Sequence, residues 1–239
     1  MMVEGLGVLA VVPARGGSKG IPLKNLRLVG DRSLVAHVAC VVREIISIDA
    51  AILSTDDVQI AEEGERHGLE VPFMRPAQLS DDDAGSMEVW RHAWLQTEAI
   101  HGRTYDVSVL LEPTSPLRRA SDVERTIQAL LESDADCAFT VSRTQAHYTP
   151  QKTLLINSNG FTEFYLPVSQ VETTRQRIPP YFHRNGICYA VRRHQLIECG
   201  QIVGNRSLPV VIDRPVVNID EPFELELADW LYRRQCSSG

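Results

Sequence analysis

The stretch "LGVLAVVPARGGSKGIPLKN", residues 6–25, joins a run of apolar side chains to a glycine-rich loop. Residues 6–12 are almost continuously apolar, as a parallel strand is when helices cover both faces of its sheet. Pro13 ends the run, and the loop that follows concentrates positive charge. Its three cations are Arg15, Lys19 and Lys24, and its glycines are Gly16, Gly17 and Gly20. We therefore expect a buried strand that delivers a basic loop to the carboxyl end of a sheet, where ligands of such sheets bind.

Short apolar runs and amphipathic stretches alternate along much of the chain. Neighbouring parallel strands need crossover connections, which are nearly always helical and right-handed. The alternation therefore predicts an α/β fold with a mostly parallel, doubly wound (Rossmann-like) sheet. The expected strands are 6–12, 51–54, 71–74, 107–111, 136–141, 186–191 and 209–212. The expected helices are 34–46, 56–67, 86–100, a helix starting at the capping box of Ser121 and Glu124, and 222–233.

The alternation is interrupted between residues 143 and 185. This segment contains two β-like fragments, 153–156 and 161–165, around an Asn159-Gly160 turn signal. We expect a small β-rich excursion that carries a hairpin. The predicted organisation is one α/β domain made of residues 1–142 and 186–239, with residues 143–185 inserted in it.

Composition limits the classes of partner. The chain of 239 residues carries a formal net charge of −7, and its acidic pI of about 5.5 argues against nucleic-acid binding, because phosphates would repel most of its surface. No run approaches the roughly 20 apolar residues of a membrane helix, and the N-terminus lacks the features of a signal peptide. The five cysteines are scattered, without a C-x-x-C pair. We expect a cytoplasmic protein with neither membrane nor nucleic-acid partners.

The basic loop is suited to a polyphosphate. It lacks the G-x-G-x-x-G fingerprint of dinucleotide sites, and Lys19 is followed by Gly20 rather than by the Ser or Thr of a Walker A loop. Its glycines permit close approach by a ligand, and its cations would surround a dense negative charge such as a nucleoside triphosphate. The alternative is a flexible connector whose cations are merely solvated.

Six short blocks extend this pattern in order along the chain. They are "ARGGSKGIPLKN" (14–25), "LSTDD" (53–57), "RPAQLSDDDAGS" (75–86), "LLEPTSPLR" (110–118), "RNGICY" (184–189) and "NIDEPFELELA" (218–228). In these blocks the chain resembles the acylneuraminate cytidylyltransferases, the synthetases of CMP-sialic acid and related CMP-nonulosonic acids. The resemblance implies an enzyme that joins CTP to a nonulosonic α-keto sugar acid and releases pyrophosphate, with Mg²⁺ as cofactor. It also implies a homodimer, in which the excursion 143–185 is the dimerisation segment.

The resemblance assigns the nucleotide site. It implies that Arg15 and Lys24 hold the triphosphate and act with Asp220 in catalysis. The wider set of nucleotide-binding positions is Arg15, Lys19, Lys24, Asn25, Arg75 and Ser86. Ser86 has an alternative role, because it lies where a helix N-cap is expected and serine is favoured there for its hydroxyl alone.

The metal assignment comes with a departure from the family. Asp220 matches a magnesium ligand, and its alternative role is to cap the helix that starts at Glu221 and Pro222. Where the family usually has Asp-Ile-Asp, this chain has Asn218-Ile219-Asp220. The amide oxygen of Asn218 can still coordinate a cation or bind its water, although one charge is lost.

The acceptor side departs from the family as well. Glu112 stands where glutamine is usual, so we expect it to contact hydroxyls or an amino group of the acceptor, or to be a solvated loop carboxylate. Lys152, Arg175 and Arg184 are candidates for the sugar carboxylate or the phosphates, since arginine donates two parallel hydrogen bonds to a carboxylate. These departures keep two alternatives open: a different acid acceptor, such as an eight-carbon sugar acid, and a weakly catalytic nucleotide-binding homologue.

Overall fold

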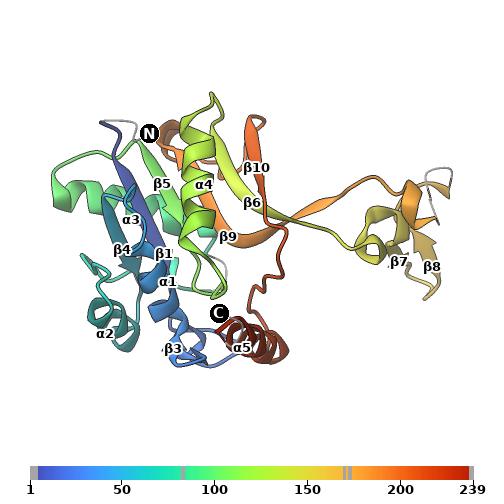
Figure 1. Ribbon diagram of the computed structural model, residues 1–239, viewed down its shortest axis with the longest axis horizontal. Coiled ribbons are helices and arrows are strands. Elements are labelled where there is room, and N and C mark those ends of the chain that lie inside the picture. Colours follow the sequence, from blue (N-terminus) through green and yellow to red (C-terminus); the bar gives the residue numbers. More distant parts are fainter. Residues whose placement is uncertain (1–4, 82–83, 169–170, 172–173, 237–239) are drawn as a thin grey trace.

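A six-stranded sheet in the order β10-β6-β9-β5-β1-β4 forms the centre of the molecule (Figure 1). The structure is a computed structural model and describes residues 5–81, 84–168, 171 and 174–236. All sheet strands run parallel except β9, which is antiparallel to both β5 and β6. The predicted α/β fold with a mostly parallel sheet is confirmed. The strands are β1 (Val8–Pro13), β4 (Ala50–Ser54), β5 (Val107–Leu110), β6 (Cys137–Arg143), β9 (Phe182–Arg192) and β10 (Ser207–Val211).

Two apolar layers cover the two faces of this sheet. Strand β1 is buried on both sides, and its side chains alternate between two core clusters, with Val8, Ala10 and Val12 in one and Leu9 and Val11 in the other. The first cluster contains α1 (Leu34–Val42), α2 (Val58–Arg66) and α4 (Ala120–Leu131), and the second contains α3 (Ser86–His101). This double burial explains why the strand is continuously apolar.

The last helix closes the carboxyl end of the sheet. Helix α5 (Pro222–Cys236) packs on the short hairpin of β2 (Leu28–Val29) and β3 (Arg32–Ser33). A third apolar cluster joins this region to the loops around it. Its buried members are Ile21, Val29, Leu34, Leu117, Val217, Ile219 and Ala228.

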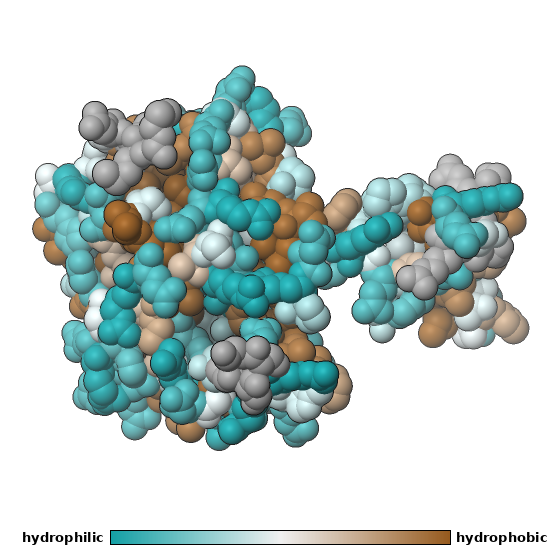
Figure 2. Space-filling model, in the orientation of Figure 1, coloured by the Kyte–Doolittle hydropathy of each residue, from teal (hydrophilic) through white to brown (hydrophobic). Residues whose placement is uncertain are grey.

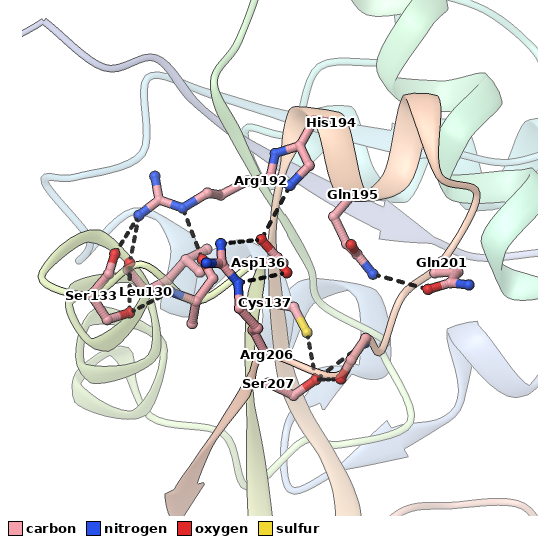
Figure 3. Close-up of polar contacts among 12 residues, drawn as sticks. Leu130, Ser133, Asp136, Cys137, Arg192, His194, Gln195, Gln201, Arg206 and Ser207 are labelled. Atoms are coloured by element: carbon pink, nitrogen blue, oxygen red, sulfur yellow. Dashed lines mark hydrogen bonds and ion pairs between the residues drawn. The ribbon is translucent and has the colours of Figure 1, made fainter.

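The opposite, amino end of the sheet is held by charged side chains (Figure 3). Asp136 accepts hydrogen bonds from Arg206 at 2.9 Å and pairs with His194 at 3.2 Å. Arg192 donates to main-chain carbonyls at the end of α4, including that of Leu130 at 2.9 Å. These contacts join the ends of β6, β9 and β10 and leave the ligand-binding edge on the other side.

An arm extends from the body between β6 and β9 (Figure 1). These two strands pair from Val141 with Arg184 to Arg143 with Phe182, where the chain enters and leaves the arm. The arm carries the antiparallel hairpin β7 (Leu154–Ile156) and β8 (Thr162–Phe164). The hairpin prediction is confirmed, and Gly160 in its turn has a positive φ of 81°. Strand β9 starts at Phe182, before the expected 186, because it continues along β6 into the arm.

Three local predictions are wrong. No strand forms over 71–74, where the preceding Glu70 makes only an isolated bridge to Ile52. Helix α1 ends at Val42, short of the expected residue 46. The capping box does not involve Ser121, because α4 begins one residue earlier and the carboxylate of Asp122 accepts the Arg119 N–H at 2.9 Å.

Candidate functional site

A cavity of about 610 Å³ opens at the carboxyl ends of β1 and β5. Its walls come from four separate parts of the chain: 13–25, 75–89, 112–114 and 218–220. Nine of the predicted site residues meet here, which are Arg15, Lys19, Lys24, Asn25, Arg75, Ser86, Glu112, Asn218 and Asp220. The carboxyl-end location is where an α/β sheet of this kind binds its ligands.

The loop after β1 forms the cationic wall. The Arg15 guanidinium donates to the carbonyl of Asp81 at 2.8 Å, and Lys24 donates through Nζ to the carbonyl of Ile219 at 2.8 Å and to Oδ1 of Asp220 at 3.0 Å. The buried amide of Asn25 donates to the Arg15 carbonyl at 2.9 Å. The loop is therefore held in shape by one internal hydrogen bond and by contacts with residues 81 and 219–220, and its cations line the cavity.

The backbone of the same loop has an unusual conformation at one residue. Leu23, directly before Lys24, has φ 51° and ψ 41°, in the left-handed region that non-glycine residues rarely adopt. Residues held in this region cluster at functional sites, where surrounding contacts stabilise them. The Gly16 N–H donates to Oδ1 of Asp56 at 3.0 Å, which ties the loop to the end of β4.

Arg75 reaches the cavity from a buried position. Its guanidinium donates to the hydroxyl of Ser54 at 3.1 Å, to the Ser54 carbonyl, and to the carbonyl of Leu79 at 3.4 Å. Burial lowers the pKa of Arg75 to about 10, so the side chain stays charged at neutral pH. A buried, fixed cation of this kind is suited to reading a polar ligand group.

Ser86 and Asp220 are not helix caps. Gly85 is the N-cap of α3, and Ser86 is its first residue, exposed at the cavity. At α5 the carboxylate of Glu224 accepts the N–H groups of Asp220 at 2.7 Å and of Glu221 at 2.9 Å. The alternative cap roles for Ser86 and Asp220 are therefore wrong, and both side chains are available to a ligand in the cavity.

Asp220 and Asn218 present oxygen donors that fit a magnesium ion. Both residues line the cavity, and the Asp220 side chain is 69% exposed beside Lys24. Magnesium takes one or two protein carboxylates together with phosphate oxygens and water. The described part of the chain has no group of three His, Cys, Asp or Glu side chains placed to hold a metal. An ion here would therefore depend on ligands from a bound phosphate.

Glu112 is a half-buried acid that lines the cavity directly after β5. Burial raises its pKa above the ordinary value, the neighbouring Asp220 adds to the rise, and Arg118, Lys24 and Arg184 oppose it. A carboxylate with a raised pKa that lines a cavity is typical of a functional position. Its partial burial favours a role at the cavity over the alternative of a freely solvated loop carboxylate.

Replacing Glu112 with glutamine is expected to stabilise the protein at pH 7. Because the folded-state pKa is raised above its ordinary value of 4.5, the native state binds more protons than the unfolded state above that pH. Stability conferred by this group is therefore lost as pH rises through the window that begins near 4.5. Melting temperatures of both proteins from pH 4 to 8 check this: the gap should open with rising pH, and a constant gap would contradict it.

Three predicted residues do not line the cavity. Lys152 is exposed on the arm, in a 3-10 helix spanning Pro150–Lys152. Arg175 begins another 3-10 helix of the arm, Arg175–Arg177, and its side chain lies outside the described part of the structure. Arg184 is exposed on β9, close enough to lower the pKa of Glu112.

Sequence reasoning missed a buried residue behind Glu112. The Arg118 guanidinium donates to the carbonyl of Glu112 at 2.7 Å and to the carbonyls of Gly186 and Ile187. Burial lowers the pKa of Arg118 to about 10. Arg118 lies inside the "LLEPTSPLR" block, but nothing in that pattern indicates a side chain that points into the core.

Comparison with known proteins gives a family match. Residues 9–200 match the profile of a family described as cytidylyltransferase. The pseudaminic acid cytidylyltransferase of Campylobacter jejuni is 27% identical over 226 residues, 94% of this chain and 96% of that protein. The CMP-N,N'-diacetyllegionaminic acid synthase of Legionella pneumophila is 26% identical over 226 residues, 94% of this chain and 95% of that protein.

A solved structure shares the fold over nearly the whole chain. It is a CMP:2-keto-3-deoxy-manno-octonic acid synthetase complexed with CTP, with a TM-score of 0.70 and 19% sequence identity. The superposition covers 96% of this chain and 99% of that chain. No helix in the described ranges is long and apolar enough to cross a membrane.

Proposed function

The chain belongs to the cytidylyltransferase family, and on that premise we propose that it joins CTP to a nonulosonic sugar acid and releases pyrophosphate. The observation that carries the proposal is the cavity itself, where the cations Arg15, Lys19 and Lys24 lie beside Asp220 at the carboxyl end of the sheet. Arg75, Ser86 and Asn25 line the same space and are the proposed contacts to the rest of the nucleotide.

The proposed reaction is an in-line displacement at the α-phosphorus of CTP. The anomeric hydroxyl oxygen of the sugar acid forms the new P–O bond and loses its proton, and the bond from the α-phosphorus to the pyrophosphate oxygen breaks. Catalysis of this type rests mainly on positioning and on neutralising phosphate charge. We assign Arg15 and Lys24 to the charge on the phosphates.

Asp220 and Asn218 are the proposed holders of Mg²⁺. When bound, the ion would supply positive charge to the phosphate oxygens. Lys24 pairs with Asp220 at 3.0 Å, so the proposed phosphate-binding cation and the proposed metal-holding carboxylate lie side by side.

Two relatives support the choice of a nonulosonic acceptor. One is named a pseudaminic acid cytidylyltransferase, and the other a CMP-N,N'-diacetyllegionaminic acid synthase. An eight-carbon acid is the second candidate. Its support is weaker, because the synthetase structure for such an acid is only 19% identical and shows a shared fold alone. CTP is made and used inside the cell, so we place the protein in the cytoplasm.

Pyrophosphate release tests the proposal directly. The protein is incubated with CTP, Mg²⁺ and a panel of acids that includes pseudaminic, legionaminic, N-acetylneuraminic and 2-keto-3-deoxyoctonic acids, with UTP as a control donor. Release with the nonulosonic acids, accompanied by the CMP conjugate, supports the proposal. Release with the eight-carbon acid alone would favour the second candidate, and tight CTP binding without release would indicate a non-catalytic homologue.

We also propose that the arm is the contact between two copies of the chain. Figure 2 shows it as a lobe set apart from the body, with hydrophobic residues on its surface. Patches of this kind on an element with no body to cover it are typical of interfaces. Its exposed large apolar side chains are Tyr148, Leu154, Leu155, Ile156, Phe161, Phe164, Tyr165 and Val168. In a dimer of this kind, Lys152 and Arg175 are candidates to reach the partner's acceptor.

Changing Ile156 to aspartate is expected to shift the protein from dimer to monomer. Ile156 is 77% exposed on the arm, and a charge there would be desolvated in an interface. Ile46, which is 85% exposed on the body, provides the matched control, and Ile46→Asp should leave the dimer intact. Light scattering after size exclusion measures both. A wild-type monomer, or equal effects of the two changes, would rule out the arm as the interface.

A further inference from the structure

The segment that carries Asn218 and Asp220 has no regular secondary structure of its own. Residues 212–220, all of which the structure describes, form neither helix nor strand, and they lead from the end of β10 to α5 (Figure 1). Such a backbone has no ladder or helical hydrogen bonds to fix it. The position of the two proposed metal-holding residues therefore depends on contacts with neighbouring parts of the chain.

Arg214 makes the first of these contacts. Its Nη2 donates to the carbonyl of Leu117 at 2.9 Å and forms an ion pair with the carboxylate of Asp122. The side chains of Arg214 and Asp122 are only 18% and 7% exposed. Asp122 lies in the first turn of α4, where its carboxylate also accepts the Arg119 N–H. Because breaking a buried pair leaves an uncompensated charge, this contact fixes the start of the segment on α4.

The segment then runs beside the loop after β5 in the opposite direction. Three contacts join them, and their order along one chain is reversed along the other. They run from Arg214 to the Leu117 carbonyl at 2.9 Å, from the Ser115 hydroxyl to Oδ1 of Asn218 at 3.5 Å, and from the Ile219 N–H to the Thr114 carbonyl at 2.8 Å. Leu117 and Ile219 also belong to the third apolar cluster. Since packed interiors transmit displacement, a shift at Arg214 is passed on to Asn218 and Asp220.

The loop after β5 is itself fixed to the sheet. The buried guanidinium of Arg118 donates to the Glu112 carbonyl at 2.7 Å and to the Gly186 carbonyl of β9 at 3.4 Å. A planar guanidinium that reaches carbonyls of two segments holds them at a set separation. The loop therefore gives Arg214 a fixed support.

We propose that Arg214 is a positioning residue for the metal: by holding the segment on Leu117 and Asp122, it sets where Asn218 and Asp220 present their oxygens in the cavity. The inference deepens the proposed cytidylyl transfer and rests on its assignment of Mg²⁺ to these two residues. Arg214 does not line the cavity, so it acts through the segment and not on a substrate. The alternative is an ion pair that only stabilises the fold.

Arg214→Met and Arg214→Lys separate these two roles. Methionine removes the charge and leaves Asp122 unpaired. Both contacts of Arg214 use the single nitrogen Nη2, so a lysine ammonium can take its place in the ion pair, although the shorter side chain displaces the segment. Arg192→Met is the matched control, because Arg192 also donates to main-chain carbonyls but at the opposite end of the sheet. A melting curve checks the folding of each variant.

Direct metal binding is the main measurement. Binding of Mn²⁺ to the full chain is followed by electron paramagnetic resonance in the presence of CTP and without an acceptor. Arg214→Met is expected to raise the Kd for Mn²⁺ about tenfold, the lower end of the range for partners that orient metal ligands. Arg214→Lys should raise it about threefold, because it keeps the charge but not the geometry. Arg192→Met should leave it unchanged even where it lowers the melting temperature.

Kinetics give a second measurement that a merely structural role would not move. The Mg²⁺ concentration for half-maximal pyrophosphate release should rise in both Arg214 variants by the same factors as the Kd for Mn²⁺. KM for the acceptor, measured at saturating Mg²⁺, should stay at its unmodified value, because the change acts on the metal and not on the sugar acid.

Other results would overturn the inference. Unmodified Mn²⁺ affinity in folded Arg214→Met, or in Arg214→Lys if the methionine variant does not fold, would show that the ion pair only stabilises the protein. An equal loss of affinity in Arg192→Met would show the same. An unmodified protein that binds no Mn²⁺ with CTP would refute the metal assignment and this inference together. Mn²⁺ binding without pyrophosphate release from any acid would refute the proposed transfer alone, because the effect of Arg214 on the Kd is still measured.

Discussion

Replacing Lys24 with alanine is expected to lower kcat/KM for CTP by about 100-fold or more, the range seen when one preorganised charge-stabilising group is removed. The Lys24 side chain is only 15% exposed and lies in the cavity wall beside Asp220. A cation in so restricted a place has little freedom, so it would oppose phosphate charge without costly rearrangement. Stopped-time assays of pyrophosphate release at varied CTP measure the effect.

The same change should cost the fold little. Lys24 also donates to the carbonyl of Ile219, but its partner Asp220 is 69% exposed, and ion pairs open to solvent contribute about 0–1 kcal/mol. Arg27→Ala is the matched control, because Arg27 lies just after this loop, is exposed and does not line the cavity. Equal activities of the two variants would remove Lys24 from the proposed site.

The architecture was predictable where one local signal dominated. Strand β1 is apolar at every position because its two faces feed two different core clusters. The cationic loop is visible in the composition of one short stretch, where glycines and three cations directly follow the strand. The strand and the loop are each formed by residues that are neighbours in the sequence, so the sequence pattern alone is sufficient to predict them.

The errors arose where tertiary contacts decide. Residues 71–74 look like a strand, yet their backbone is not used by the sheet, which ends at β4. Ser121 and Glu124 have the right spacing for a capping box, but the box forms two residues earlier, where the carboxylate of Asp122 accepts the N–H of the N-cap residue Arg119. Local propensity is a weak prior when several nearby groups can satisfy the same backbone N–H.

The site itself depends on contacts between distant parts of the chain. Lys24 and Asp220 are 196 residues apart, and the motif match places each of them separately without indicating that they pair. Arg118 is similar, because its carbonyl partners on β9 lie 68 and 69 residues away. The sequence motifs thus identified many residues of the cavity. Which of their charged side chains pair with one another could be learned only from the fold.

A substitution at Gly20 tests whether the close packing of the basic loop against residues 218–220 matters for activity. A Cβ atom on Gly20 would lie 2.7 Å from the main-chain carbonyl oxygen of Asp220, so alanine there forces one of the two backbones to move. Movement would separate Lys24 from Ile219 and Asp220 at the point where phosphate and metal are proposed to bind. Gly20→Ala is expected to lower kcat/KM for CTP about 100-fold, since misplacement by about 1 Å can have that effect.

Gly17 provides the matched control within the same loop. A Cβ atom on Gly17 would meet nothing within 4 Å, and Gly17 has an ordinary negative-φ backbone, so Gly17→Ala should keep activity within about twofold. Gly17→Ala should melt close to the unmodified protein, whereas Gly20→Ala is expected to melt lower, because the displaced segments include Ile21 and Ile219 of the third apolar cluster. Activities are therefore compared at a temperature at which both variants are folded. Pyrophosphate release, CTP binding by calorimetry and melting curves distinguish the cases. If Gly20→Ala bound CTP and turned over as well as Gly17→Ala, the close contact of loop and segment would have no part in nucleotide binding, and Asp220 would have to act without support from the loop.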